Sequence, residues 1–358
     1  MIQVPAKVSN LLIVQPGSIG DVILTLPTIA QLRLNFPKSK IHWAIEEKAY
    51  PIVKHQPDIR FHIFSESKLK VKAPLSTFYQ ILKLRQSLHR EAIDLVVDLQ
   101  GFFQSGLVTK LSGARLKVGF HRKNTRRGNC LFLDTTLPHI PERSLHRVDF
   151  FQRVIPALGG QLFALNDPFQ FKFLEEEEKG LKNLLHRLRI KNPYFVLHVG
   201  SRSQAKRWTA RGFFELIPLI RKQYPKHSIL LTGAGKEDHD FEREILKNIE
   251  PQMVQSSINK INLRELALII KNAGFLVAGD SPALHLGSAF KTPSIGLFGR
   301  TNPQQYGPYT PGYAGLRHTV PCYPCQKNFC SHHSCMNNLA SNVVFRNLAL
   351  LYRFGENK

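Results

Sequence analysis

Short, uninterrupted apolar runs alternate along the chain with stretches in which apolar positions recur at helical spacing. The first run, Leu11–Val14, ends at Pro16-Gly17, and a helical pattern opens at Asp21. The same order of strand, loop and helix recurs further along, with segments at Ile41–Ile45, Leu95–Leu99 and Phe102–Leu111. Such alternation is typical of a parallel sheet that is covered by helices.

The alternation restarts after an acidic, helix-prone segment over residues 173–188. The predicted strands and helices of this second half include Tyr194–His198, Arg211–Arg221, Ser228–Thr232, Leu263–Lys271, Gly274–Ala278 and Ser294–Phe298. We therefore predict an α/β protein with two doubly wound domains, over residues 1–165 and 175–335. The C-terminal segment, 338–358, is expected to form a helix that packs back across the junction of the two domains.

Length and composition agree with two globular domains. The chain has 358 residues, of which 43% are hydrophobic, so a disordered or fibrous protein is excluded. No uncharged apolar run reaches the roughly 18 residues of a membrane-spanning helix, and the first residues lack the order of a signal peptide. We therefore expect a cytoplasmic protein, in which cysteines serve as thiols or ligands rather than in disulfides.

The chain is strongly basic, with 49 Lys and Arg against 26 Asp and Glu and a formal net charge of +23. No acidic residue lies between Asp98 and Asp134, a stretch that holds Lys110, Arg115, Lys117, Arg122, Lys123, Arg126 and Arg127. A solvated face is the ordinary explanation for such a run. Its length in an already basic protein also favours a polyanionic partner: nucleic acid, an anionic membrane surface or a phosphorylated substrate.

Ligands of open α/β sheets bind in the loops that follow the carboxyl ends of the strands. The first such loop, Pro16–Asp21, has two glycines that permit a tight turn before a helix. It matches neither the dinucleotide fingerprint nor the phosphate loop with its lysine. Asp21 has two interpretations. It is either an acid that caps the helix or a carboxylate at the edge of a binding site that accepts a proton.

The loop after the predicted strand Tyr194–His198 suits an anion. Gly200 and Ser201 offer backbone and hydroxyl donors, and Lys206 supplies a positive charge to a phosphate. Trp208 is more typical of a packing anchor than of a stacking partner.

A second glycine-containing loop, Gly233–Gly235, follows the strand Ser228–Thr232. Such a turn brings the backbone close to a ligand, and Glu237 could accept hydrogen bonds from the two hydroxyls of a ribose. The alternative is a turn followed by an acid that caps a helix.

The most specific loop signal lies at Gly279–His285. Asp280 or Ser281 suits the N-cap of a helix, and Pro282 suits its first turn, where the missing N–H costs nothing. The helix start then offers free amides to a phosphate. His285 lies four residues after Ser281, on the same face.

Four of the five cysteines lie within 14 positions, at Cys322, Cys325, Cys330 and Cys335. Their spacing differs from that of standard zinc fingers, so a structural zinc site, reduced packing thiols and a reversible disulfide all remain open. The fifth, Cys130, stands apart and is expected in the core.

The loops together resemble the lipopolysaccharide heptosyltransferases of glycosyltransferase family 9. The resemblance extends from Leu11 to about Pro308 and rests on the order of six motifs: Gly17–Asp21, Asp98–Gly101, Val118–Arg122, Ala205–Trp208, Gly279–His285 and Phe298–Pro303. It implies a GT-B fold, in which two Rossmann-like domains face a cleft, and transfer of heptose from ADP-heptose with inversion. It implies no cofactor and no catalytic metal.

The resemblance also implies roles for single residues. Asp21 matches the family's general base, and Lys206 the lysine that contacts the diphosphate. The other donor-binding matches are Ser201, Gly233, Glu237, Asp280, Ser281 and His285. On the acceptor side they are Ser18 and Gly20, with Arg122 and Arg126 from the basic stretch. Pro282 departs from the family motif, which usually has Gly at this position, so one amide for the donor phosphate is lost.

The implied partners are ADP-heptose and an anionic lipopolysaccharide precursor, Kdo-lipid A or heptosyl-Kdo-lipid A. The positive charge would also bring the protein to the inner face of the cytoplasmic membrane. One alternative is another nucleotide-sugar transferase of the same fold that acts on a different core sugar. A zinc-bearing nucleic-acid-binding protein would explain the charge and the cysteines but not the four ligand loops, and no nucleic-acid motif is present. We therefore expect no nucleic-acid partner.

Overall fold

The computed structural model describes residues 2–65, 74–125, 128–141, 145–323, 325 and 327–356. The chain divides into two compact units, residues 1–172 and 173–358. The division falls between the two predicted domain bounds, 165 and 175.

The first unit is a six-stranded parallel sheet in the order β3-β2-β1-β4-β5-β6. Its strands are β1 (Asn10–Val14), β2 (Lys40–Glu46), β3 (Ile59–Phe64), β4 (Leu95–Asp98), β5 (Leu116–Gly119) and β6 (Thr135–Thr136). Its helices are α1 (Ile19–Asn35), α2 (Tyr50–Val53), α3 (Pro74–His89), α4 (Phe103–Leu111), α5 (Arg147–Gln152) and α6 (Val154–Ala157), with the 3₁₀ turns η2 (Arg122–Asn124) and η3 (Asn129–Phe132).

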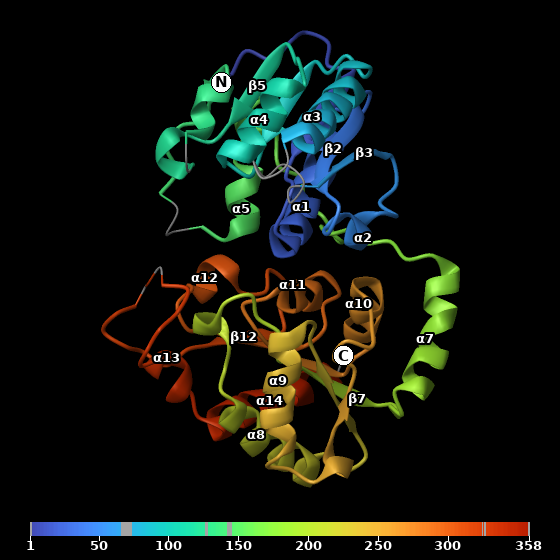
Figure 1. Cartoon of the computed structure of the whole chain (residues 1–358), viewed down its shortest axis with the longest axis vertical. Helices are drawn as coiled ribbons and strands as arrows, with labels where there is room; N and C mark the ends of the chain where they lie inside the picture. Colours follow the sequence, from blue (N-terminus) through green and yellow to red (C-terminus); the bar gives the residue numbers. More distant parts are fainter. Residues whose placement is uncertain are drawn as a thin grey trace. The chain divides into compact units, whose positions relative to one another are not determined.

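The central strand β1 explains why the first apolar run has no polar interruption. All four residues of Leu11–Val14 are fully buried, since β1 is paired on both sides and covered on both faces. Val14 lies opposite both Ala44 of β2 and Asp98 of β4. The carboxyl ends of β1 and β4 are therefore neighbours, which brings the loop before α1 beside the turn after β4 (Figure 1).

The second unit repeats the architecture with the strand order β12-β11-β10-β7-β8-β9, again all parallel. Its strands are β7 (Tyr194–His198), β8 (Ser228–Thr232), β9 (Gln255–Ser256), β10 (Phe275–Gly279), β11 (Ser294–Leu297) and β12 (Tyr313–Leu316). Its helices are α7 (Glu175–Arg187), α8 (Ala210–Gln223), α9 (Lys236–Leu246), α10 (Leu263–Lys271), α11 (Pro282–Ala289), α12 (Pro303–Tyr306), α13 (Ser334–Asn337) and α14 (Ser341–Glu356), with the 3₁₀ turns η5 (Gln204–Lys206) and η6 (Pro251–Met253).

The last helix, α14, packs onto the second unit. Val344, Leu348 and Tyr352 of α14 are buried in the core cluster of the second unit, which also contains Phe195 and Trp208. The indole Nε1 of Trp208 donates to the carbonyl oxygen of Leu339 at 2.9 Å. The helix thus contributes its apolar face to the core of its own unit. Its packing across the junction stays a prediction.

Within the part of the chain that the structure describes, no helix combines the length and the hydropathy needed to cross a membrane.

Candidate active site

The loop between β1 and α1 holds Asp21 by two side chains. The helix begins at Ile19, so Ser18 occupies the N-cap position and Asp21 is the third helical residue. The Ser18 hydroxyl donates to Asp21 Oδ2 at 3.0 Å, and Arg147 Nε lies 3.6 Å from Asp21 Oδ1. The Asp21 side chain is 29% exposed. Asp21 is therefore not the N-cap, and its carboxylate is oriented yet accessible to a ligand.

Arg147 at the start of α5 was not predicted from the sequence. Its guanidinium carbon lies 4.8 Å from the ring centroid of Phe150 and 4.5 Å from that of Phe151, and its side chain is 21% exposed. Stacking on two rings fixes the guanidinium beside the carboxylate of Asp21. No local motif marks this arginine, because its partner lies more than a hundred positions earlier in the chain.

The turn after β4 supports the loop before α1. The side-chain oxygen of Gln100 accepts from the backbone N–H of Gly17 at 3.3 Å, and Gln15 Nε2 donates to the Gly17 carbonyl at 2.7 Å. Asp98 is fully buried, and its carboxylate accepts from Asn129 Nδ2 at 2.8 Å and from the N–H of Gly101 at 3.1 Å. Burial raises the pKa of Asp98, and these donors oppose the rise.

The other predicted acceptor residues divide between the loop and the basic stretch. Gly20 is buried in the first turn of α1, next to Asp21. Arg122 is exposed in η2, and Thr125 just after this turn packs within contact distance of Gly101. Arg126 lies outside the described residues.

In the second unit, Lys206 and Asp280 form a close ion pair. Lys206 Nζ lies 2.6 Å from Asp280 Oδ2, with side-chain exposures of 27% and 5%. Gly279 makes the approach feasible, since a Cβ at this position would lie 2.9 Å from the carbonyl oxygen of Lys206. The sequence predicted both residues in one donor site but not their pairing. Asp280 is buried behind the ammonium and directs it.

The helix α11 begins as predicted, with Ser281 at the N-cap and Pro282 at the first helical position. The Ser281 side chain does not cap the helix, and in the described part of the chain its hydroxyl oxygen is buried without a hydrogen-bond partner. A buried hydroxyl without a partner is costly, so it is available to a ligand at the start of the helix. His285 is buried in the same helix, at 4% exposure.

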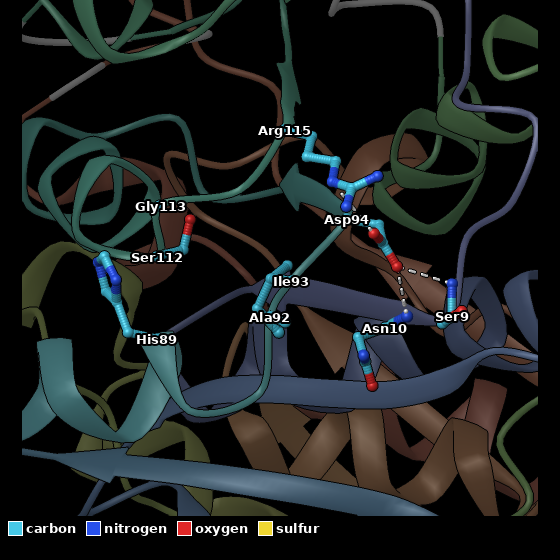
Figure 2. A pocket seen from close by; sticks show the side chains of 9 residues that line it. All are labelled: Ser9, Asn10, His89, Ala92, Ile93, Asp94, Ser112, Gly113 and Arg115. Carbon is cyan, nitrogen blue, oxygen red and sulfur yellow. Dashed lines mark hydrogen bonds and ion pairs between the residues drawn. The ribbon is translucent and has the colours of Figure 1, made fainter.

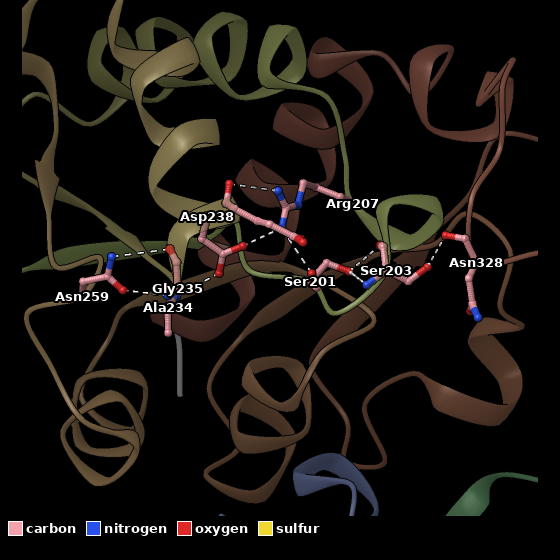
Figure 3. Close-up of polar contacts among 9 residues, drawn as sticks. Ser201, Ser203, Arg207, Ala234, Gly235, Asp238, Asn259 and Asn328 are labelled. Atoms are coloured by element: carbon pink, nitrogen blue, oxygen red, sulfur yellow. Dashed lines mark hydrogen bonds and ion pairs between the residues drawn. The ribbon is translucent and has the colours of Figure 1, made fainter. Parts of the chain in front are cut away.

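No role was predicted for Arg207 from the sequence. In the structure it connects the loop after β7 with the start of α9. Its Nη2 lies 2.6 Å from Asp238 Oδ1 and donates to the Ser201 carbonyl at 3.2 Å, and its Nη1 donates to the Glu237 carbonyl at 3.3 Å. Figure 3 shows the guanidinium reaching both the start of α9 and the loop after β7. Burial raises the pKa of Asp238, whereas its bond from the Ala234 N–H and the charge of Arg207 oppose the rise.

Two glycines permit this close packing around Asp238. A Cβ on Gly200 would lie 2.8 Å from Asp238 Oδ2, and one on Gly233 would lie 2.9 Å from the same atom. His198 at the end of β7 is buried beside them, and its Nδ1 lies 2.9 Å from Thr232 Oγ1. Burial and the nearby Arg207 lower the pKa of His198 to about 4, so the imidazole is neutral at pH 7.

The remaining predicted donor residues surround this network. The Ser201 hydroxyl donates to the carbonyl of Ser203 at 2.9 Å, and Ser203 Oγ donates to the carbonyl of Asn328 at 2.6 Å. Glu237 is the second residue of α9, and its side chain is 85% exposed. Its carboxylate, whose Oε2 lies 3.9 Å from Arg207 Nη2, is exposed to a ligand such as a ribose, while its backbone carbonyl accepts from Arg207.

The cysteine segment supports the donor loop and packs as thiols. The carbonyl of Asn328 also accepts from the N–H of Ala205 at 3.3 Å. Cys335 is buried in the core cluster of the unit, and burial together with the other three thiols raises its pKa. Among the described residues, no three His, Cys, Asp or Glu side chains are placed to hold a metal ion, and all five cysteines are free. The zinc and disulfide alternatives for Cys322, Cys325, Cys330 and Cys335 stay predictions.

A pocket of about 460 Å³ opens at the other edge of the first sheet (Figure 2). Its lining includes Ser9 and Asn10, whose backbone N–H groups donate to Asp94 Oδ2 at 2.8 and 3.1 Å, and Arg115. These residues lie at the amino ends of β1, β4 and β5. The pocket is therefore separate from the loops that carry the predicted site.

Comparison with known proteins agrees with the arrangement of the loops. The family described as glycosyltransferase family 9 (heptosyltransferase) matches residues 81–336. The chain is similar to lipopolysaccharide heptosyltransferase 3 of Escherichia coli K12, with 26% identity over 293 residues, 81% of this chain and 83% of that protein.

Solved structures show the same fold at low sequence identity. A family 9 glycosyltransferase from Veillonella parvula has a TM-score of 0.80 at 18% identity, over 96% of this chain and 97% of that one. The E. coli ADP-heptose lipopolysaccharide heptosyltransferase II has a TM-score of 0.77 at 18% identity, over 97% and 99%. The family match covers most of the chain and both sheets repeat the GT-B architecture, so the chain belongs to glycosyltransferase family 9, the heptosyltransferases, and is a glycosyltransferase of the GT-B class.

Proposed function

We propose that this glycosyltransferase moves heptose from ADP-heptose to the inner core of a lipopolysaccharide precursor, Kdo-lipid A or heptosyl-Kdo-lipid A, with inversion at the anomeric carbon. The observation that carries the proposal is the Lys206–Asp280 pair at the start of α11, beside the buried Ser281 hydroxyl. A directed ammonium and a free hydroxyl at a helix start are what a departing nucleoside diphosphate requires. Family membership supplies the sugar and the reaction class.

The second unit is proposed to hold the donor. Lys206 stabilises the negative charge that grows on the diphosphate as the bond to the sugar breaks, and the Ser281 hydroxyl donates to a phosphate oxygen. The Ser201 hydroxyl donates to another once it turns away from the carbonyl of Ser203. Gly233 lets the backbone at the carboxyl end of β8 pack against Asp238. The turn that it begins is proposed to contact the nucleotide, and Glu237 to accept from the ribose hydroxyls. His285 completes the site from within α11. Pro282 lacks one amide, so the ammonium of Lys206 carries more of the charge stabilisation here.

In the first unit, Asp21 is proposed to act as the general base. The acceptor hydroxyl attacks the anomeric carbon, the carbon–oxygen bond to ADP breaks on the opposite face, and Asp21 takes the hydroxyl proton. The Ser18 hydroxyl and Arg147 hold the carboxylate in one orientation before the substrate arrives.

The acceptor is proposed to bind through its negative charges. Kdo carboxylates and lipid A phosphates would meet Arg122 and Arg126, while Ser18 and Gly20 shape the turn beside the reacting hydroxyl. The same charges would bring the protein to the inner face of the cytoplasmic membrane. We do not propose the nucleic-acid-binding alternative, because the chain belongs to a glycosyltransferase family.

Release of ADP from ADP-heptose against truncated acceptors tests this proposal. We expect turnover with one of Kdo-lipid A and heptosyl-Kdo-lipid A and none without acceptor. Turnover only with a precursor that already carries further core sugars would refute the inner-core assignment while keeping the enzyme class.

A further inference from the structure

Three large apolar side chains are exposed together at the carboxyl edge of the first sheet. Phe102 is 36% exposed, Phe103 at the start of α4 is 46% exposed, and Leu131 in η3 is 80% exposed. We call these three residues the apolar platform. Each leaves apolar surface in contact with water, and apolar surface gathered in one patch marks an interaction site.

The two segments that carry the apolar platform, Phe102-Phe103 and η3, are fixed to each other. Asn129 Nδ2 donates to the Phe102 carbonyl at 2.9 Å, and the rings of Phe103 and Phe132 meet edge to face with centroids 5.1 Å apart. A Cβ on Gly106 would lie 2.4 Å from the Phe132 ring, so Phe132 packs closely onto α4. Phe132 thus fills the inward position of η3, and its neighbour Leu131 projects outward.

Basic side chains flank the platform. Arg122 and Lys123 are exposed in η2, and the contact of Thr125 with Gly101 places this turn next to Phe102. No acidic residue occurs anywhere between Asp98 and Asp134. Apolar groups flanked only by positive charge match a surface that is negatively charged and has an apolar interior.

We propose that the apolar platform, with Lys123 and Arg122 beside it, is the surface by which this protein docks on an anionic lipid bilayer. Phe102, Phe103 and Leu131 enter the headgroup region, while the two cations attract the acidic headgroups. A peptide or protein partner would not by itself explain the lack of acid over the whole stretch. The position also suits the proposed function, on which this point rests, since a lipid-anchored acceptor would be presented at the edge that carries Asp21.

Vesicles without any acceptor test the docking surface apart from the transfer reaction. The full-length protein is floated with vesicles in which phosphatidylglycerol makes up a quarter of otherwise phosphatidylcholine lipid. We expect Phe103→Ser with Leu131→Ser to weaken partitioning by at least about tenfold, and Lys123→Ala by about fivefold. Salt should weaken the wild type and the apolar variant alike, because it screens the charge term only.

Leu34→Ser is the matched control. Leu34 is 48% exposed near the end of α1, at the opposite edge of the sheet. It should partition as the wild type does, and all variants should keep their rate on a soluble, deacylated acceptor. Equal binding by wild type and the double variant, or an equal loss in Leu34→Ser, would overturn the proposal. The proposal would also be overturned if Phe103→Ser with Leu131→Ser changed the self-association of the protein in sedimentation but not its binding to vesicles. Failure of heptose transfer would leave the vesicle result intact.

Discussion

Among single residues, Asp21 has two interpretations that make different predictions, a helix-start acid and a general base. Ser18 occupies the N-cap, so the helix does not depend on Asp21 for that position. The carboxylate instead accepts from the Ser18 hydroxyl and pairs with Arg147. Asp21 is thus a partly exposed acid in the first turn of α1 that two neighbours hold in place, and its role as the base is the prediction tested next.

Replacing Asp21 by Asn tests this role. Asn keeps the size and the hydrogen bond from Ser18 but cannot accept a proton. We expect turnover at least about a hundredfold lower, since general-base catalysis contributes roughly 10²–10⁴ in rate. Binding of ADP-heptose and the urea midpoint should stay close to the wild type. Near wild-type turnover would remove Asp21 from the reaction.

Arg207 should contribute more to the free energy of unfolding than Asp21 does. Arg207→Met leaves the buried carboxylate of Asp238 without its cation, which costs about 3–5 kcal/mol when a buried pair is broken on one side. The double variant Arg207→Met with Asp238→Asn should recover part of this loss, because the uncompensated charge is gone. Urea unfolding of the four proteins in this cycle measures the coupling. Independent, additive losses would show that the pair is not coupled.

Candidate site residues could be predicted from the sequence where a single loop carries the motif. Asp21, Lys206, Asp280 and Ser281 all lie in the loops and helix starts that follow β1, β7 and β10, where the motifs placed them. Arg147 and Arg207 could not be assigned roles, since each acts through a partner that only the fold brings near.

At the scale of elements, the predicted strands are those that are buried on both faces. The run in β1 and the run in β7 are fully buried and read as unbroken apolar segments. The strand β3 was not predicted, because it is an edge strand in which buried residues alternate with more exposed ones. The strands β5 and β12 were missed because they are short and only partly buried.

The strands β2 and β3 also carry a buried histidine pair that predicts a pH effect. His42 Nδ1 lies 3.1 Å from His62 Nε2, and the other ring nitrogens meet Asn10 and Ser87. Burial, with the nearby charges, lowers the pKa of each imidazole to about 4. The unfolded chain therefore binds protons first as the pH falls, and the folded state loses stability between about pH 6.5 and pH 4.

Urea unfolding at pH 7 and pH 5 measures this loss. One imidazole with a pKa of about 4 instead of 6.5 corresponds to roughly 3 kcal/mol at the low end of the window. The variant His42→Gln with His62→Gln cannot take up these protons and should show a smaller difference between the two pH values. An unchanged difference would place the pH dependence elsewhere in the chain.

At the scale of the whole molecule, the chain consists of two units with the same parallel architecture. The restart of the strand–helix alternation after residue 173 could be read from the sequence, because both halves have the same period. The place of α14 could not, since an amphipathic helix at the end of a chain gives no sign of which core receives it. The structure places its apolar face in the core of the second unit.

We expect the nucleotide of the donor to bind to the second unit. The loops that carry Ser201, Lys206, Glu237 and Ser281 all belong to it. Hydrogen exchange with and without ADP should show protection at the start of α11 and in the loop after β7, and none in the loop before α1. Protection confined to the first unit would reverse the assignment of donor and acceptor.

Transfer of heptose from ADP-heptose is tested most directly by comparing sugar donors on a single inner-core acceptor that the enzyme uses. Product mass and anomeric configuration are measured for ADP-heptose and for other nucleotide sugars. We expect a product heavier by one heptose, with the anomeric configuration inverted relative to the donor, and far slower reaction with every other sugar nucleotide. Faster use of a different nucleotide sugar, or a product that retains the donor configuration, would contradict it.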